Sequence, residues 1–312
     1  MTETADRPLV TFALFAYNQE QYIREAVEGA FAQTYEPLEI ILSDDCSTDR
    51  TFEIMQEMAA AYEGPHEVRV RQSYANRGIT GHINDIADTA RSDILVMAAG
   101  DDVSAPVRTE RLSRVFQNDT TIQAVFSSFS TAPTDCNPEP SDTIHYETVR
   151  PLELAYNAGG LGKGATYAYR LKCLTWPTKM DESLRSEDRI LPMRAAMMGA
   201  VAFVREPLVF YRHLETGMSR TLRDQKSFAR NSWPHISNAL LEIDTARNEG
   251  SITGPRAGFY RTAYRLRYAL SAAASGQNPA NRMLGRLCHK VAKATVTVVT
   301  RPRSRGTTAV NH

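Results

Sequence analysis

The stretch from residue 9 to residue 49, LVTFALFAYNQEQYIREAVEGAFAQTYEPLEIILSDDCSTD, joins two apolar runs through a helical pattern. The runs Leu9 to Phe15 and Leu38 to Ser43 are short and rich in apolar residues, which is typical of buried strands. Between them, apolar residues from Ile23 to Phe31 recur at i, i+3, i+4, i+7 and i+8, which predicts an amphipathic helix capped by Asn18. Because such crossovers are right-handed, the stretch predicts two parallel strands of one sheet.

The same alternation of strand and helix continues toward residue 130. We expect further strands at Glu67 to Gln72, at Ile94 to Ala98 and near Gln123 to Ser128, with helices starting near Ser47 to Asp49 and around Gly81 to Ala90. This order predicts an α/β fold in which a mostly parallel central sheet is flanked by helices. The loops that leave the carboxyl ends of parallel strands share one edge, and ligands of open α/β sheets bind there.

The second half of the chain has a different pattern. Residues 130–148 are rich in Pro, Asp, Ser and Thr and indicate a loop, whereas Glu187 to Met198 has helical spacing. Beyond about residue 221 the pattern is helical. We therefore expect an α/β domain over residues 1–220, a basic helical C-terminal region over 221–300, and a disordered tail over 301–312.

The composition of the 312-residue chain is that of a globular protein, with 42% hydrophobic and 23% charged residues. No run approaches the roughly 18 apolar residues of a membrane span, and the acidic N-terminus does not resemble a secretory signal. The four cysteines are far apart, which argues against a zinc site or disulfide framework and favours a cytoplasmic location. Residues 220–312 hold 16 basic and 4 acidic residues, so this part carries +12 and the preceding part −12 within a chain of zero net charge. This split indicates that the two parts meet different partners or each other.

Polar residues follow four of the expected strands, in Ala16 to Glu20, Asp44 to Asp49, Asn76 to Gly78 and Gly100 to Asp102. A helix cap or a turn explains any one of them, but four acidic or polar clusters at one edge are typical of a site compensated by a cation or a hydrogen-bonding ligand. Adjacent carboxylates such as Asp101 and Asp102 are the hard oxygen ligands that Mg²⁺ or Mn²⁺ takes. Since neither a P-loop nor a GxGxxG motif is present, metal clamping remains as the way to hold a diphosphate.

Glu187 and Asp188 precede an apolar helix. One interpretation is an N-terminal pair of acids favoured by the helix dipole. The other is a general base, because a sugar or lipid hydroxyl becomes a nucleophile when a carboxylate removes its proton in the transition state. Both interpretations stay open at this point.

Seven stretches in series resemble the family-2 glycosyltransferases with the GT-A fold, and they cover about residues 8–220. They are Pro8 to Thr11 through Tyr17-Asn18, Gln33 to Tyr35, Asp44 to Asp49, Asn76 to Gly78 with Asn84, Gly100 to Asp102, Glu187-Asp188, and Leu208 to Arg212. The resemblance implies a Rossmann-like GT-A domain with a nucleotide-binding half at about 8–128 and an acceptor half at about 150–220. It implies inverting, metal-dependent transfer of a sugar from a nucleotide diphosphate donor to an acceptor hydroxyl.

The resemblance also assigns roles to individual residues. Donor-binding residues would be Ala16, Tyr17, Asn18, Glu20, Asp45, Asn76, Asn84, Asp101 and Arg212, with Tyr17 and Asp45 holding the nucleobase. The catalytic residues would be Asp188, as the base, with Glu187, and the Mn²⁺ or Mg²⁺ ligands would be Asp101, Asp102 and His213. The sequence departs from the family pattern at Ala99, at Ile83 and at His213, which follows Arg212 directly, so a surface histidine is the alternative there.

The expected partners are a nucleotide diphosphate sugar, by default a UDP-sugar, and a saccharide or lipid-linked acceptor of surface polysaccharide or glycoconjugate synthesis, with no nucleic acid. Basic residues from Arg282 to Lys293 recur at helical spacing and indicate either peripheral contact with the inner face of a membrane or packing against the acidic part. Two other functions remain. One is a non-catalytic nucleotide-sugar-binding protein, and the other is a sugar-nucleotide nucleotidyltransferase, which the absence of glycine from Phe15 to Asn18 disfavours.

Overall fold

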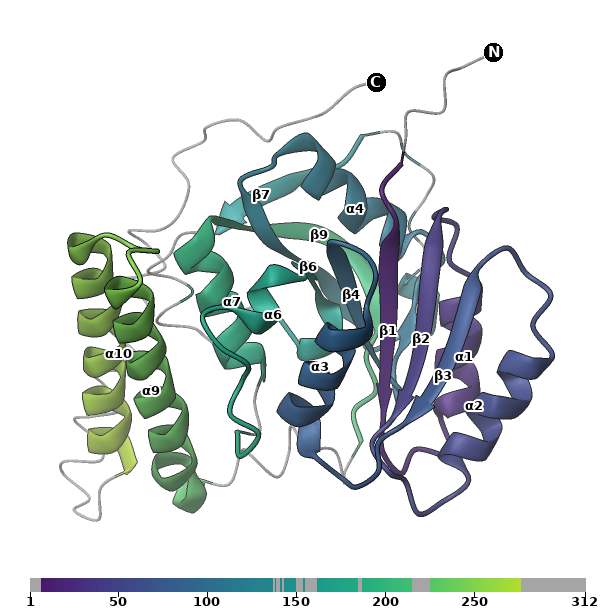
Figure 1. Cartoon of the computed structure of the whole chain (residues 1–312). Coiled ribbons are helices and arrows are strands. Elements are labelled where there is room, and N and C mark those ends of the chain that lie inside the picture. Colours follow the sequence, from purple (N-terminus) through teal and green to yellow (C-terminus); the bar gives the residue numbers. More distant parts are fainter. Residues whose placement is uncertain are drawn as a thin grey trace.

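The computed structural model describes residues 7–275 except 137, 139, 140, 142, 150–153, 155–161, 185, 186 and 215–224. The strands are β1 (Val10–Ala16), β2 (Leu38–Asp44), β3 (Glu67–Gln72), β4 (Ile94–Ala99), β5 (Val103–Ser104), β6 (Ile122–Ser130), β7 (Tyr146–Val149), β8 (Tyr167–Arg170) and β9 (Ala200–Phe210). The helices are α1 (Ile23–Phe31), α2 (Thr51–Ala60), α3 (Gly78–Thr89), α4 (Arg108–Asn118), α6 (Lys172–Thr175), α7 (Glu187–Met198), α9 (Gln225–Asn248) and α10 (Gly254–Ser275). Figure 1 shows their arrangement around one central sheet.

The strands form one sheet in the order β3-β2-β1-β4-β8-β6-β9-β5, with β7 paired to β9. The strands β3, β2, β1 and β4 are parallel, as predicted for the first half of the chain. Beyond β4 the sheet is mixed, because β8 runs antiparallel to both of its neighbours, β4 and β6. The predicted α/β fold with a central sheet flanked by helices is confirmed.

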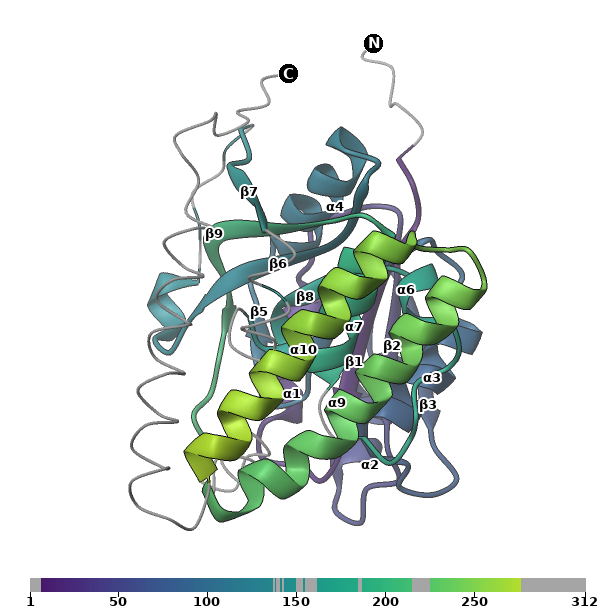
Figure 2. The same ribbon diagram turned by 90° about the vertical axis from the view of Figure 1, so that its left-hand side faces the viewer.

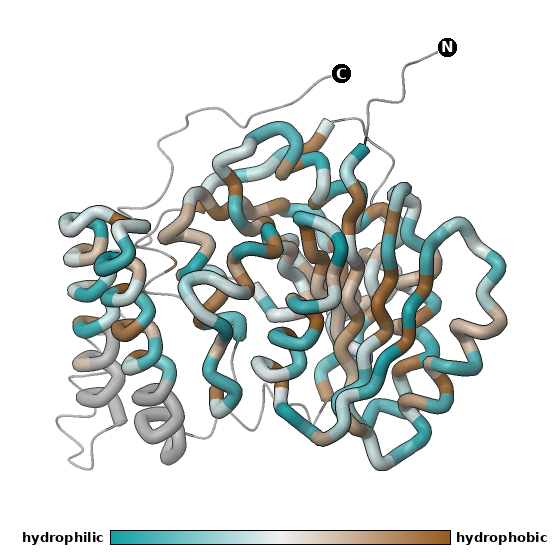
Figure 3. The backbone as a smooth tube through the Cα atoms, viewed as in Figure 1, coloured by the Kyte–Doolittle hydropathy of each residue, from teal (hydrophilic) through white to brown (hydrophobic). Residues whose placement is uncertain are grey.

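Alternate residues of the buried strands pack on opposite faces of the sheet, as the two-residue period of a strand requires. In β1, Phe12 and Leu14 belong to a core with α1, α2 and α4, whereas Ala13 and Phe15 belong to a core with α3, α6 and α7. Figure 3 shows the hydrophobic strands between polar helix surfaces. The apolar runs that predicted the strands are therefore apolar because both faces are covered.

Helices α9 and α10 form a hairpin that lies across α7, outside the second of these layers (Figure 2). Its buried side chains, such as Ile243 and Tyr260, belong to the same core cluster as α7. Within the described part of the chain, no helix has the length and hydropathy needed to cross a membrane. The basic segment from Arg282 to Lys293 and the tail at 301–312 lie outside the described residues.

Two local predictions are wrong. The helix after β1 begins at Ile23 and has Tyr22 at its N-cap, without a side-chain cap, because Asn18 lies further back with φ of 52° and bonds to another loop. The stretch expected to be a loop at residues 130–148 contains β7 at its end, paired antiparallel with β9. Both differences arise from partners that are distant in the sequence.

Candidate active site

The loops that follow β1 and β2 are joined side by side at the carboxyl edge of the sheet. Asn18 Oδ1 accepts the backbone N–H of Thr48 at 2.8 Å, and the Asn18 N–H donates to Ser47 Oγ at 2.8 Å. In the same way, the backbone N–H of Glu20 donates to Asp49 Oδ2 at 3.1 Å. These bonds fix the loop that presents Tyr17, whose side chain is 44% exposed. The Asn18 side chain and the Glu20 backbone therefore build the edge of the site, with Tyr17 exposed upon it.

Asp45 is buried just beyond the end of β2 and points at the N-terminus of α3. Its Oδ1 accepts the N–H of Arg77 at 3.0 Å and its Oδ2 accepts the N–H of Gly78 at 2.9 Å. Burial raises the pKa of the Asp45 carboxyl, partly offset by these hydrogen bonds. Gly78 has φ of 69°, a conformation that glycine adopts without strain, which lets the helix start against this carboxylate.

The two predicted asparagines lie in different surroundings. Asn76 is exposed next to Asp45, and its Oδ1 accepts the N–H of Gly78 at 3.1 Å. Asn84 is buried inside α3, where its amide donates to the Met180 carbonyl at 2.8 Å and accepts the Met180 N–H at 3.1 Å. Asn84 thus holds the segment that leads into α7, whereas Asn76 lies at the sheet edge with Asp45.

The acidic pair Asp101–Asp102 follows β4 through a glycine that the packing requires. A Cβ on Gly100 would lie 2.5 Å from Gln19 Oε1 and 2.9 Å from the Cβ of Ala16, so a larger residue would push the ends of β1 and β4 apart. The Gln19 side chain also hydrogen-bonds Asp101. Asp101 is therefore tied to the loop that carries Tyr17.

Burial raises the pKa of both carboxyls of this pair, and the Asp101 carboxylate raises that of Asp102 further. Asp102 Oδ1 accepts the backbone N–H of Arg212 at 3.0 Å, which brings the end of β9 to the pair. The Arg212 guanidinium pairs with Glu25 and lies 5.2 Å from the ring centroids of Tyr22 and Phe210. Its positive charge favours the ionised forms of both aspartates.

His213 is not gathered with the acidic pair. Its side chain is exposed, and its ring packs edge-on against Tyr211 at a centroid distance of 5.4 Å. In the described part of the chain, no three His, Cys, Asp or Glu side chains lie together as a ready-made metal site. Two adjacent carboxylates, of which Asp101 raises the pKa of the buried Asp102, nevertheless fit a Mg²⁺ or Mn²⁺ ion that takes its other ligands from water and substrate phosphate.

Arg108 is a residue of this region that the sequence did not indicate. It is fully buried, and it donates to the carbonyl of Met97 at 2.7 Å and to that of Ala165 at 2.6 Å. Burial lowers the pKa of Arg108 to about 9, and the nearby Asp102 acts in the opposite direction. Arg108 thus supplies a fixed positive charge beneath the acidic pair. Its first-turn position in an amphipathic helix gave no sign of this role.

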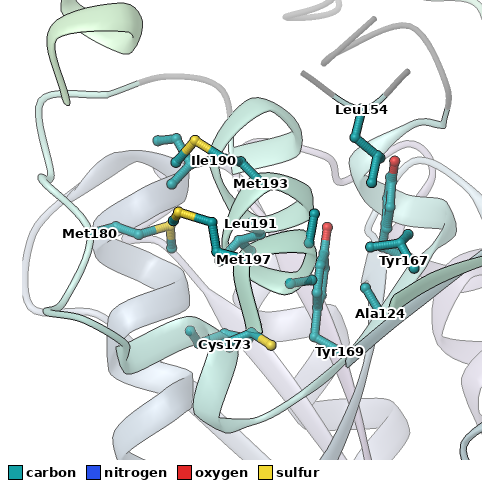
Figure 4. Close-up of a cluster of buried hydrophobic side chains, with 14 of the residues drawn as sticks. Ala124, Leu154, Tyr167, Tyr169, Cys173, Met180, Ile190, Leu191, Met193 and Met197 are labelled. Atoms are coloured by element: carbon teal, nitrogen blue, oxygen red, sulfur yellow. The ribbon is translucent and has the colours of Figure 1, made fainter. Parts of the chain in front are cut away.

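The second acidic pair, Glu187–Asp188, lies in the first turn of α7. Burial and the Asp188 carboxylate raise the pKa of Glu187. Both carboxylates act on the phenols of Tyr167 and Tyr169, whose rings stack at a centroid distance of 5.3 Å. Figure 4 shows the two hydroxyls pointing to the same side. Gly164 makes room for Glu187, because a Cβ there would lie 1.9 Å from Glu187 Oε1.

A strap at residues 179–184 connects the two regions along α3. Arg77, whose backbone binds Asp45, pairs through its guanidinium with Glu182 of the strap and with Asp85. The strap is also bound through Thr80 Oγ1, which donates to the Leu184 carbonyl at 2.9 Å. The loop that presents Asp45 is therefore linked through α3 to the segment that precedes Glu187.

Comparison with known proteins identifies the class of this arrangement. Residues 11–161 match the model of the family described as glycosyl transferase family 2. Residues 11–161 of this chain therefore belong to glycosyl transferase family 2. The matched range contains the loops after β1, β2 and β3 and the acidic pair Asp101–Asp102. The family match and the glycosyltransferases among the relatives support an enzyme over a purely non-catalytic binding role.

Individual relatives match shorter stretches. An uncharacterized protein of Mycobacterium tuberculosis (strain ATCC 25618 / H37Rv) is 43% identical over 88 residues, which are 28% of this chain and 25% of that protein. The putative glycosyltransferase EpsE of Bacillus subtilis (strain 168) is 33% identical over 104 residues, which are 33% of this chain and 37% of EpsE. The match thus spans about a quarter to about a third of the length of these curated relatives.

Two solved structures, one of them of a mannosyltransferase, share the fold over most of the chain. Residues 1–349 of S. aureus TarS, in complex with UDP-GlcNAc, superpose with a TM-score of 0.62 at 18% identity, covering 83% of this chain and 72% of that one. The mannosyltransferase PcManGT from Pyrobaculum calidifontis, in complex with GDP-Man and Mn2+, gives a TM-score of 0.56 at 18% identity, covering 96% and 89%. The predicted GT-A fold is confirmed.

Proposed function

We propose that this family-2 glycosyltransferase transfers a sugar with inversion, and with a divalent cation, from a nucleotide diphosphate donor to an acceptor hydroxyl. The observation that carries the proposal is the adjacent pair Asp101–Asp102, in which burial raises the pKa of both carboxyls and Asp101 raises that of Asp102 further, between Gln19 and Arg212. Like charges crowded in this way are stabilised by a cation, and a departing diphosphate needs the same neutralisation.

The donor binds at the carboxyl edge of β1, β2 and β4 in this proposal. Tyr17 offers an exposed ring to the nucleobase, and Asp45 and Asn76 lie at the next strand end to contact its polar edge. Arg212 lies next to the acidic pair and interacts with the diphosphate oxygens. We take a UDP-sugar as the default donor, since TarS was solved with UDP-GlcNAc, and GDP-Man, which is bound to PcManGT, as the alternative.

Asp101 and Asp102 would hold Mg²⁺ or Mn²⁺, which, when bound, neutralises the charge that develops on the leaving diphosphate. Asp188 accepts the proton of the acceptor hydroxyl, and the freed oxygen attacks the anomeric carbon as its bond to the diphosphate breaks. Glu187 lies beside Asp188, which together with desolvation raises its pKa, so the pair keeps a proton over much of the neutral range. The phenols of Tyr167 and Tyr169 lie within the electrostatic reach of both carboxylates and form a neighbouring wall of the proposed site.

The acceptor is proposed to be a saccharide or a lipid-linked saccharide of a surface polysaccharide or glycoconjugate. The chondroitin synthase of Escherichia coli, a polysaccharide-forming enzyme by its name, is 34% identical over 122 residues, which are 39% of this chain and 17% of that protein. A basic C-terminal region would bring the enzyme to an anionic membrane surface at the cytoplasmic side, where lipid-linked acceptors are located.

A thermal-shift panel of nucleotide diphosphate sugars, with Mn²⁺, with Mg²⁺ and with EDTA, tests donor and metal together. A ligand at about 100 times its Kd stabilises the folded state by ~2.7 kcal/mol, so UDP-GlcNAc or GDP-Man should raise Tm only when the cation is present. The product's anomeric configuration, read by NMR, tests inversion. A donor that binds and is consumed equally well in EDTA would contradict metal dependence.

The variant Asp188→Asn tests the proposed base. Its donor-dependent thermal shift should match that of the unchanged chain, while its turnover should fall by ~10² or more, the contribution typical of a general base. The control is Glu249→Gln, which changes an exposed carboxylate between α9 and α10. An Asp188→Asn enzyme with unchanged turnover would remove Asp188 from the mechanism.

A further inference from the structure

Arg194, in the middle of α7, carries a buried charge that the donor site and the acidic pairs do not account for. Its side chain is completely buried, and so is almost all of Glu242 on α9, to which it is paired. Arg194 Nε donates to Glu242 Oε2 at 3.0 Å and Nη2 donates to Oε1 at 2.6 Å, which is the two-pronged geometry of a strong arginine–carboxylate pair.

The remaining polar groups of this pair are also engaged. Arg194 Nη1 donates to the Leu174 carbonyl at 2.9 Å, so the same guanidinium joins α7 to the end of α6. Asn238, one turn before Glu242 on α9, donates to Glu242 Oε1 at 3.0 Å. A network satisfied in this way has one arrangement that meets all its directional bonds, and it therefore fixes three helices relative to one another.

The pair is placed where it controls the start of α7. Glu187 and Arg194 are seven residues apart, which is about two turns and ~10 Å along a helix, on nearly the same side. Rotation or sliding of α7 would therefore move both together. Pro192 lies between them and lacks the N–H that would bond the Asp188 carbonyl, so the helix depends more on outside contacts for its position.

A second contact from the hairpin reaches the same helix. The Ala196 carbonyl of α7 accepts Arg256 Nη2 at 2.7 Å and Tyr260 Oη at 2.9 Å, both from α10. The apolar side of α7, including Ile190, Met193 and Met197, packs in the core that Figure 4 shows. Apolar packing tolerates small shifts, whereas these directional bonds do not.

We propose that Arg194 is a positioning residue for the Glu187–Asp188 pair, and that its bond to Glu242 makes the hairpin α9–α10 a required part of the transfer site. The proposal rests on the proposed function of Glu187 and Asp188 in proton removal. Arg194 touches neither substrate nor reacting atoms. Its effect is on turnover, because a displacement of about 1 Å at a reacting group can cost 10²-fold in rate.

The double variant R194M/E242L tests the proposal. It replaces the ion pair by apolar side chains, a change that commonly leaves folding stability equal or higher. We expect Tm and the donor-dependent thermal shift with UDP-GlcNAc or GDP-Man to match the unchanged chain, and kcat to fall at least about tenfold at constant donor KM. R194K, which keeps the charge but cannot bond α6 and Glu242 together, is expected to lose part of that rate.

The control is D244N, two residues from Glu242 on α9. Asp244 pairs with Arg261 of α10 at a half-exposed position, so the variant removes an ion pair within the hairpin and leaves the tie to α7. Its kcat should equal that of the unchanged chain. A folded R194M/E242L or R194K enzyme with unchanged kcat, or one whose donor KM alone changes, would overturn the positioning role. An unchanged chain that binds no nucleotide diphosphate sugar would instead overturn the proposed function, and with it this inference.

Discussion

Replacing Gly164 by alanine isolates the position of Glu187 from its chemistry. The new Cβ would lie 1.9 Å from Glu187 Oε1, and ordinary contacts begin at 3.4 Å, so the carboxylate must move by about 1.5 Å. The obstructing atom is the end of a flexible side chain, so the fold can adapt. Gly164 does not adopt a positive φ, and alanine there reduces the entropy of the unfolded chain, for a net stability change within about 1 kcal/mol.

Turnover should respond much more strongly than stability. A displacement of this size at a reacting group can cost ~10² in rate, so G164A should lose one to two orders of magnitude in kcat with an unchanged donor-dependent thermal shift. The measurement is nucleotide release from the donor at saturating concentration, beside a melting curve. G258A is the matched control, because a Cβ on Gly258 of α10 meets nothing within 4 Å. A G164A enzyme as active as G258A would show that the position of Glu187 is irrelevant to the reaction.

Three further predictions concern charge. Burial and Asp188 raise the pKa of Glu187 to about 8 from 4.5, and the proton that the pair keeps competes with the acceptor proton for Asp188. Therefore kcat should climb as the pH rises toward 8, and E187Q should flatten that limb of the pH–rate profile. Asp101→Asn removes one of two repelling carboxylates, so Tm in EDTA should rise while the Mn²⁺-dependent part of the donor shift disappears. Glu182→Gln breaks the partly exposed ion pair with Arg77 and should lower the free energy of unfolding by less than ~1 kcal/mol. It should nevertheless lower kcat more than the control Asp88→Asn, which breaks the exposed pair of Asp88 with Lys179 of the same strap.

The first half of the fold could be predicted because its signals are local. A run such as Ile94 to Ala99 is apolar at every position, and that property predicts a buried strand without knowledge of its neighbours. The strand β8 could not be predicted in the same way. Whether Tyr167 to Arg170 forms a strand or a helix is decided by the gap between β4 and β6, which it fills antiparallel to both. Such long-range pairing leaves little trace in the sequence around it.

The candidate site shows the same limit. Asp101 and Asp102 were predicted because two carboxylates after a buried strand are unusual in themselves. Arg108 was missed, since a charged residue in the first turn of an amphipathic helix normally faces solvent. Its burial depends on carbonyls from β4 and from the segment before β8, which come together only in the folded sheet. Asn18 was misassigned for a related reason, because its partner Thr48 belongs to another loop.

Within the described residues, ion pairs between the two parts of the chain do not account for their opposite net charges. Among ion pairs of the described residues, the one that joins the hairpin to α7 has its acid, Glu242, on the C-terminal side and its base, Arg194, on the catalytic side. Arg261 pairs within the hairpin, and Arg247 and Arg265 are exposed. The acidic surplus of the first part includes the two pairs of carboxylates of the proposed site, Asp101–Asp102 and Glu187–Asp188. In the proposed function the two parts meet different partners, a cation at the sheet edge and an anionic membrane surface at the basic C-terminal region.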